Sequence, residues 1–240
     1  MLVAFDLYQR RVARRGGSPL VPPELFAERA FTAGLATTVL FFVTVASFFL
    51  VLALELQEGR GLDPLESGLV FGFEGIGFFA ATLVSGRFVA RLGRQALALG
   101  ALVRTVALIA LYFAVDHIGA HGSVAWLAGP MLLDGAGLGL VMGPIVAIVL
   151  AGVAPRNAGA ASGVLATAQQ IGNALGVAII GTVFFSELGS SVNTDAFGDA
   201  FSVALAVQAA FALAASVLVS RARQTSRERA AAPMPVREGA

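Results

Sequence analysis

The sequence predicts an all-α membrane protein in which six helices cross a lipid bilayer. Of its 240 residues, 57% are hydrophobic and only 13% are charged, which is about half the charge of an ordinary soluble domain. The mean hydropathy of +0.82 indicates more apolar surface than a chain of this length can bury in one core. Long apolar segments recur along the chain, and each approaches the roughly 20 residues that span the hydrocarbon.

Six apolar segments are predicted to be the spanning helices, between a basic segment over residues 1–30 and a polar tail over residues 221–240. The first, fifth and sixth have uncharged interiors, whereas the second contains Glu74, the third Arg104 and the fourth Asp134. The tail is rich in arginine and alanine and is predicted to be disordered. The predicted spans are 31–54, 67–88, 95–115, 123–154, 158–185 and 199–220.

Arginines are concentrated on alternate connections, which predicts the orientation because basic connections stay in the cytoplasm. Acidic residues dominate the other connections, so the pattern favours six crossings of the cell membrane with both termini cytoplasmic. The basic connections contain Arg10, Arg11, Arg14, Arg15 and Arg29, then Arg87, Arg91 and Arg94, then Arg156, then Arg221, Arg223, Arg227 and Arg229. The others contain Glu55, Glu58, Asp63, Glu66, Asp116, Glu187 and Asp195, with Arg60.

The N-terminus does not have the order of a signal peptide, in which basic residues precede the apolar run. Here the apolar run Met1–Phe5 comes first and the arginines follow. This order indicates the last turn of a preceding membrane helix, and the chain is expected to be a truncated or split reading frame.

Several functional classes are excluded by the residues that are present. The absence of cysteine excludes disulfides and thiolate metal sites. The arginines follow the membrane topology, so nucleic-acid binding is not expected, and no zinc, phosphate-loop or dinucleotide motif occurs. Ser162 lies in a sequence similar to that of an intramembrane serine protease. The two histidines, His117 and His121, precede it in an outer connection, so neither is placed as its general base, and no enzyme is predicted.

The connection between the second and third spans carries a recognisable motif. Residues 86–95, GRFVARLGRQ, resemble the loop signature G-x-x-x-D-R-x-G-R-R/K of the major facilitator superfamily. Ala90 stands at its acidic position and Gln95 at its last basic one. The matching signature residues are Gly86, Arg91, Gly93 and Arg94.

Two further stretches sharpen the resemblance. Residues 133–144, LDGAGLGLVMGP, and residues 158–176, from AGAASG to QQIGNALG, are similar to the C-terminal half of the drug:proton antiporters of the fourteen-helix type. The resemblance covers about residues 19–220. It implies a bundle of two inverted three-helix repeats, with helices one, two, four and five lining a central cavity and helices three and six supporting them.

The resemblance also implies a function, namely bacterial multidrug efflux, and with it antibiotic resistance. The implied substrate is a drug or another hydrophobic small molecule, the energy source is the proton gradient, and no cofactor or metal is required. Besides the lipid bilayer, the implied partner is an N-terminal half of six to eight helices. Two alternatives stay open: a non-transporting half-bundle, as a fragment or subunit, and a facilitator transporter of another small solute.

Ionisable residues at membrane depth are expensive and therefore mark functional sites by default. Glu74 and Asp134 are the candidates for proton coupling, and Arg104 is the candidate for an ion pair. A structural explanation competes with each of these functional ones. Glu74 would otherwise face a water-filled vestibule or pair with an arginine, and Asp134 and Arg104 would form a structural pair.

The fifth and fourth spans supply the remaining candidates. Gln169, Gln170 and Asn173 are candidates for the substrate cavity, or alternatively for hydrogen bonds to a neighbouring helix. Gln208 in the sixth span is interpreted as structural. In the fourth span, the prolines are predicted to bend the helix and the glycines either to help it move or simply to pack closely. These bending or gating candidates are Pro130, Gly135, Gly139, Gly143 and Pro144.

Overall fold

The computed structural model describes residue 22 and residues 24–119, 122–189 and 193–231. Within these ranges the chain forms helices and turns and contains no strand. Six helical segments are long and apolar enough to cross a membrane, which confirms the predicted all-α class and the count of six. The run Met1–Phe5 and the arginines that follow it lie outside the described residues.

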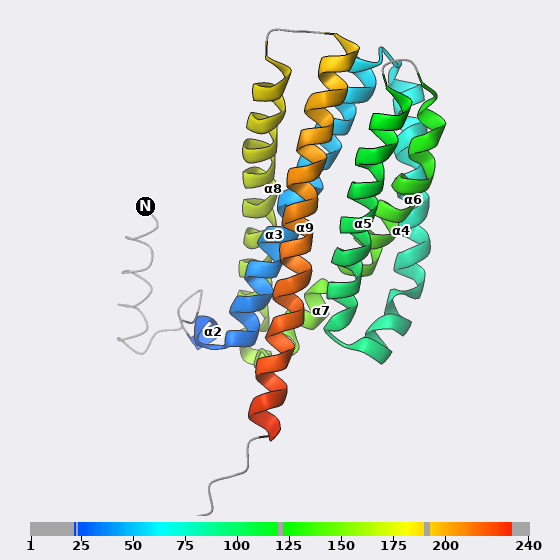
Figure 1. Cartoon of the computed structure of the whole chain (residues 1–240). Coiled ribbons are helices and arrows are strands. Elements are labelled where there is room, and N and C mark those ends of the chain that lie inside the picture. The colour runs from blue at the N-terminus through cyan, green and yellow to red at the C-terminus, as the bar shows by residue number, and fades with distance from the viewer. Residues whose placement is uncertain (1–21, 23, 120–121, 190–192, 232–240) are drawn as a thin grey trace, which may run out of the picture.

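The helices follow the predicted order (Figure 1) and mostly extend beyond the predicted spans. Backbone groups cannot bond to hydrocarbon, so the helices run past the apolar segments that hydropathy detects. They are α2 (Glu24–Ala27), α3 (Arg29–Leu54) with a π-helical turn (Glu55–Gly59), α4 (Pro64–Leu92), α5 (Gln95–Ile118), a 3-10 turn (Val124–Leu127), α6 (Ala128–Met142), α7 (Ile145–Leu150), a 3-10 turn (Pro155–Asn157), α8 (Ala158–Leu188) and α9 (Thr194–Ala231).

The last helix is longer than the sequence predicted. α9 continues to Ala231, so the prediction of a disordered tail is wrong for residues 221–231. Alanine and arginine are strong helix formers, and extending an existing helix is easier than nucleating a new one. Residues 232–240 lie outside the described residues.

The fourth span is interrupted rather than continuous over residues 123–154. α6 ends at Met142 and α7 begins at Ile145, with Gly143 and Pro144 between them. Pro144 has no amide hydrogen to donate to the preceding turn, which explains the break. Pro130 lies in the first turn of α6, where a proline removes no helical hydrogen bond, and the bend predicted there stays a prediction.

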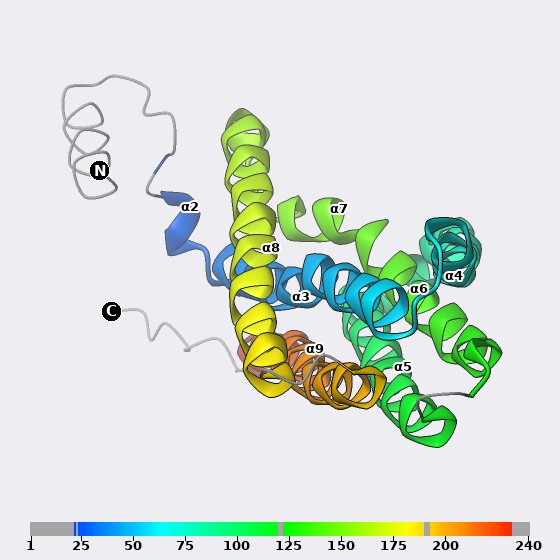
Figure 2. The ribbon, with the colours of Figure 1, turned by 90° about the horizontal axis from the view of Figure 1, so that it is seen from above.

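The helices pack in a pattern that repeats after every three spans. α3, the first span, packs on α8 and α9, and α6, the fourth, packs on α4 and α5 (Figure 2). The third and sixth spans, α5 and α9, pack on each other. Since α3 and α6 run in opposite directions through the bundle, the two halves form the inverted three-helix repeats of this type of transporter fold.

α4 and α8 are the least covered of the six spans. In the most apolar stretch of each, 28% of the residues are buried in α4 and 33% in α8, compared with 44% or more in the other four spans. One face of each helix is held by its neighbour in the other repeat. The opposite faces are open, and their composition matters for the functional interpretation.

Candidate functional site

Three ionisable side chains meet where α4, α5 and α6 pack together. Glu74 of α4 is 2% exposed, and Arg104 of α5 and Asp134 of α6 are fully buried. Because α6 contacts both α4 and α5, Asp134 lies on the helix that joins the other two. The structure therefore brings together the three residues that the sequence singled out inside the spans. We refer to Glu74, Arg104 and Asp134 as the charge cluster.

Arg104 is the centre of the charge cluster. Its Nη2 atom lies 3.5 Å from Oδ2 of Asp134 and donates a hydrogen bond of 3.2 Å to the Thr44 carbonyl oxygen of α3. Glu74 interacts electrostatically with both Asp134 and Arg104. Arg104 thus links α5 to α6 through a carboxyl group and to α3 through the backbone.

The charge cluster contains two carboxyl groups and a single guanidinium. The Glu74 and Asp134 carboxyls lie within hydrogen-bonding reach of each other, and among the described residues Nε and Nη1 of Arg104 have no hydrogen-bond partner. An uncompensated charge removed from water is costly, and a buried group neutralises rather than keep it. The cluster is negative when both carboxyls are ionised and neutral when it holds one proton.

Glycines allow α6 to enclose these charges. A Cβ atom at Gly135 would overlap the Glu74 carbonyl oxygen, and one at Gly137 would lie 2.7 Å from the backbone nitrogen of Arg104. Gly139 is similarly close to the Phe78 carbonyl oxygen of α4. Gly135 and Gly139 therefore face α4 and Gly137 faces α5, and the close approach of the backbones seals the cluster from water.

The loop signature lies at the other end of α4 from its capped N-terminus. Gly86 and Arg91 are exposed on the last turns of α4, and Gly93 ends the helix with a φ of 57°, a conformation that favours glycine. Arg94 Nη2 donates a hydrogen bond of 3.2 Å to the Ala30 carbonyl oxygen. The signature thus fastens the connection between α4 and α5 to the start of α3.

The polar residues of α8 lie apart from the charge cluster. α8 packs on α3 and α9 rather than on the helices of the cluster. Gln170 is exposed, Gln169 and Asn173 are half-buried, and Oδ1 of Asn173 has no partner among the described residues. The structure places all three beside the open face of α8 but does not bring them together with Glu74 or Asp134.

A third buried carboxyl was missed by the sequence analysis, which placed Glu55 in an outer connection. Glu55 is fully buried, and its Oε1 atom pairs with Arg60 Nε at 2.8 Å. Arg60 Nη2 also donates to the Gly119 carbonyl oxygen at 2.9 Å. A π-helical turn brings residues that are five apart in the sequence onto one face, so Glu55 and Arg60 can pair. Their spacing of five residues was the signal from which this pair could have been predicted.

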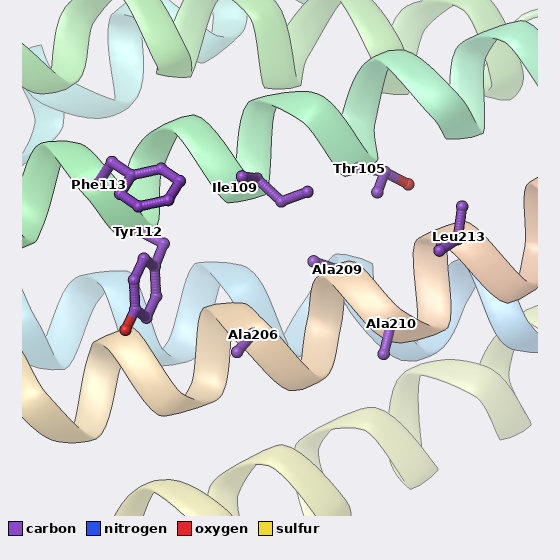
Figure 3. Close-up of a pocket in the computed structure, with 8 residues that line it drawn as sticks. All are labelled: Thr105, Ile109, Tyr112, Phe113, Ala206, Ala209, Ala210 and Leu213. Atoms are coloured by element: carbon purple, nitrogen blue, oxygen red, sulfur yellow. The ribbon is translucent and has the colours of Figure 1, made fainter.

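An apolar groove runs between α5 and α9, and Figure 3 shows its lining. Three alanines and Leu213 form the α9 side, and side chains of α5 face them across the groove. None of the predicted cavity residues lines it, and its composition suits contact with lipid acyl chains. The lining residues are Thr105, Ile109, Tyr112, Phe113, Ala206, Ala209, Ala210 and Leu213.

Comparison with known protein families relates this architecture to a large group of transporters. Residues 6–177 match the family model of the Major Facilitator Superfamily. The match includes Glu74, Arg104 and Asp134 and extends past the three polar residues of α8.

Individual relatives are about a third identical to this chain over the residues that align. A probable actinorhodin transporter of Streptomyces coelicolor is 35% identical over 79% of this chain and 33% of its own length. The puromycin resistance protein pur8 of Streptomyces alboniger is 34% identical over 76% and 36%, respectively. The cephamycin export protein CmcT of Amycolatopsis lactamdurans is 32% identical over 93% and 46%. The chain thus spans between a third and a half of the length of these relatives.

The first prediction concerns the glycine that faces Glu74. Gly135→Ala should lower the free energy of unfolding by about 1–3 kcal/mol or more, because the added methyl group overlaps backbone that cannot move independently. Gly159→Ala is the control, since nothing lies within 4 Å of its Cβ position and alanine is the better helix former. Thermal unfolding in detergent measures both. Equal stability of the two variants would contradict the proposed role of Gly135.

The second prediction concerns charge balance. Arg104→Met leaves two buried carboxyls without a cation and should lower the free energy of unfolding by about 3–5 kcal/mol near neutral pH. Adding Asp134→Asn removes one of those charges and should restore part of the loss. Lowering the pH should also reduce the loss, because a protonated carboxyl is uncharged. Thermal unfolding as a function of pH tests this, and additive effects of the two substitutions would exclude the pairing.

Proposed function

The chain belongs to the Major Facilitator Superfamily, and we propose that it is the C-terminal half of a proton-coupled exporter of drugs or other hydrophobic small molecules. Its six spans and its family make it a multi-pass membrane protein that functions in transport rather than as an enzyme. The single observation that carries the proposed coupling is the charge cluster, in which two buried carboxyls share one guanidinium.

The proposed mechanism uses the proton that neutralises the cluster. When Glu74 or Asp134 binds a proton, the attraction between the carboxyls and Arg104 weakens, and the packing of α6 between α4 and α5 changes. In this fold, transport results from one bundle rocking against the other around a central site. Proton binding would favour one orientation and substrate binding the other, so that proton entry drives export.

The open faces of α4 and α8 support a missing partner bundle. Gly68, Gly72 and Gly75 on α4 have nothing within 4 Å of their Cβ positions, although small residues in membrane helices commonly let another helix approach. α8 exposes Thr167 and Gln170, and polar side chains are unfavourable in lipid. We propose that these faces meet the N-terminal half, or water between the halves, whereas the apolar faces of α5 and α9 meet lipid.

The proposed substrate class follows from the relatives, whose names refer to actinorhodin, puromycin and cephamycin. Gln169, Gln170 and Asn173 are proposed to contribute to the substrate cavity, since they lie at the open face of α8. The arginines at the α4–α5 connection, at Arg156 and at the end of α9 support a cytoplasmic location for that end of the bundle. The proposed location is therefore the cell membrane, with both termini cytoplasmic.

The third prediction tests proton coupling. In vesicles that contain this chain joined to an N-terminal half, Glu74→Gln and Asp134→Asn should each abolish puromycin export driven by an imposed pH gradient, because neither amide binds a proton. Glu66→Gln is the control on the same helix: Glu66 is exposed, and glutamine preserves its capping box. The chain alone should export nothing. Gradient-driven export by Glu74→Gln and Asp134→Asn would refute the coupling, and export by the chain alone would refute its status as a half.

The fourth prediction tests the partner surface. Gly72→Leu should reduce co-purification of this chain with a separately produced N-terminal half by about tenfold, equivalent to about 1.4 kcal/mol, because the side chain fills the space where a helix would approach. Ala210→Leu, in the groove between α5 and α9, should have no effect. Undiminished co-purification of the Gly72 variant would exclude this face of α4 from the contact.

A further inference from the structure

The Arg104 guanidinium lies between two sets of partners, one on α6 and one on α3. On the side of α6, Nη2 is 3.5 Å from Oδ2 of Asp134, which is longer than the roughly 2.7–2.9 Å of a tight charge-assisted hydrogen bond. On the side of α3, the same nitrogen donates to the Thr44 carbonyl oxygen at 3.2 Å. The same nitrogen atom thus contacts both sides, and neither contact is short.

Two phenylalanine rings strengthen the α3 side. The Arg104 Cζ atom lies 5.6 Å from the centre of the Phe41 ring and 5.7 Å from that of Phe48, within the about 6 Å over which a ring face attracts a cation. Phe41 and Phe48 are seven residues apart, so they and Thr44 share one face of α3. Both rings are buried, so water does not weaken their attraction.

The attraction between α3 and Arg104 does not depend on protonation, whereas the attraction between the carboxyl groups and Arg104 does. The ionisable groups that reach Arg104 are Glu74 from α4 and Asp134 from α6. α3 contributes a backbone dipole and two neutral rings, and on α9 the neutral Gln208 donates to Ser47 at 3.1 Å. A proton bound by the carboxyls therefore weakens one side of the balance and leaves the other unchanged.

We propose that the Arg104 guanidinium moves toward Thr44, Phe41 and Phe48 when the charge cluster binds a proton, and back toward Asp134 when the proton leaves. Phe41 and Phe48 are then positioning residues, which act on the proton through Arg104. The inference rests on the proton-binding role proposed above and adds a route by which that proton affects α3.

The route continues from α3 to the polar face of α8. A Cβ atom at Gly176 of α8 would overlap the carbonyl oxygen of Val43, the residue that precedes Thr44. Asn173 lies one turn before Gly176 on the same helix. The Val43–Thr44 backbone is thus contacted by Arg104 on one side and by α8 on the other. A displacement of this segment reaches the proposed substrate face without passing through α4 or α6.

The fifth prediction tests the balance by removing the rings. The 240-residue chain is placed in lipid nanodiscs, and its protonated-carboxyl infrared band is titrated with pH; Glu74→Gln and Asp134→Asn identify the contribution of the cluster. Phe41→Leu and Phe48→Leu should each lower the pH midpoint of that contribution by about half a unit or more. Without a ring, Arg104 moves toward Asp134 and favours the unprotonated cluster.

Two control variants separate the rings from general packing. Phe42→Leu removes a buried neighbouring ring that is not over the guanidinium, and Phe48→Tyr retains a ring at the tested position, so both should leave the midpoint unchanged. An unchanged or raised midpoint in Phe41→Leu and Phe48→Leu, or an equal fall in Phe42→Leu, would overturn the inference and leave the proton role intact. If the wild-type chain shows no band that Glu74→Gln or Asp134→Asn removes, the proton role and the inference both fail.

Discussion

The structure depends on keeping water away from one guanidinium and two carboxyl groups inside a bilayer. Isolated charges in such surroundings are strongly unfavourable, so Glu74, Arg104 and Asp134 must lie together and their helices must approach closely. The glycines at 135 and 137 meet this requirement, since each removes the side chain that would separate α6 from a neighbour. The fourth span is therefore rich in glycine because it must pack closely around the charged residues of the second and third spans.

The same close packing occurs at the second contact between the two repeats, where α8 packs on α3, without enclosing a charge. Gly172 and Gly176 bring α8 against the Val39 and Val43 carbonyl oxygens of α3, as Gly135 and Gly139 bring α6 against α4. Between membrane helices, dispersion and close backbone contact replace the hydrophobic effect as the source of stability. A glycine pair of this kind therefore indicates a close helix contact at either place. The ionisable residue beside it distinguishes the contact that has a proposed function.

The number of spans and the three members of the charge cluster were predictable, because hydrocarbon penalises charge whatever the tertiary structure. Features that depend on helix rotation were not: hydropathy does not say which phenylalanines of α3 face Arg104, or that Gly135 contacts a neighbour while Gly159 does not. Glu55 was assigned to a connection because it follows the apolar segment, and only the π-helical turn shows it to be buried. Residues 221–231 are helical because α9 continues into them, and amino-acid composition alone does not predict such a continuation.

α4 connects the charge cluster to the proposed partner surface. Glu74 and Gly77 lie on its covered face, against α6, whereas Ile76, two residues after Glu74, is exposed on the other side of the helix. These positions are separated by less than one helical turn, and the helix is continuous from Pro64 to Leu92. A change in the packing of α4 on α6 must therefore rotate or shift the exposed face as well, because a regular helix moves as a rigid unit over this distance. In the proposed function, this continuity of α4 couples proton binding on one of its faces mechanically to whatever packs on the other.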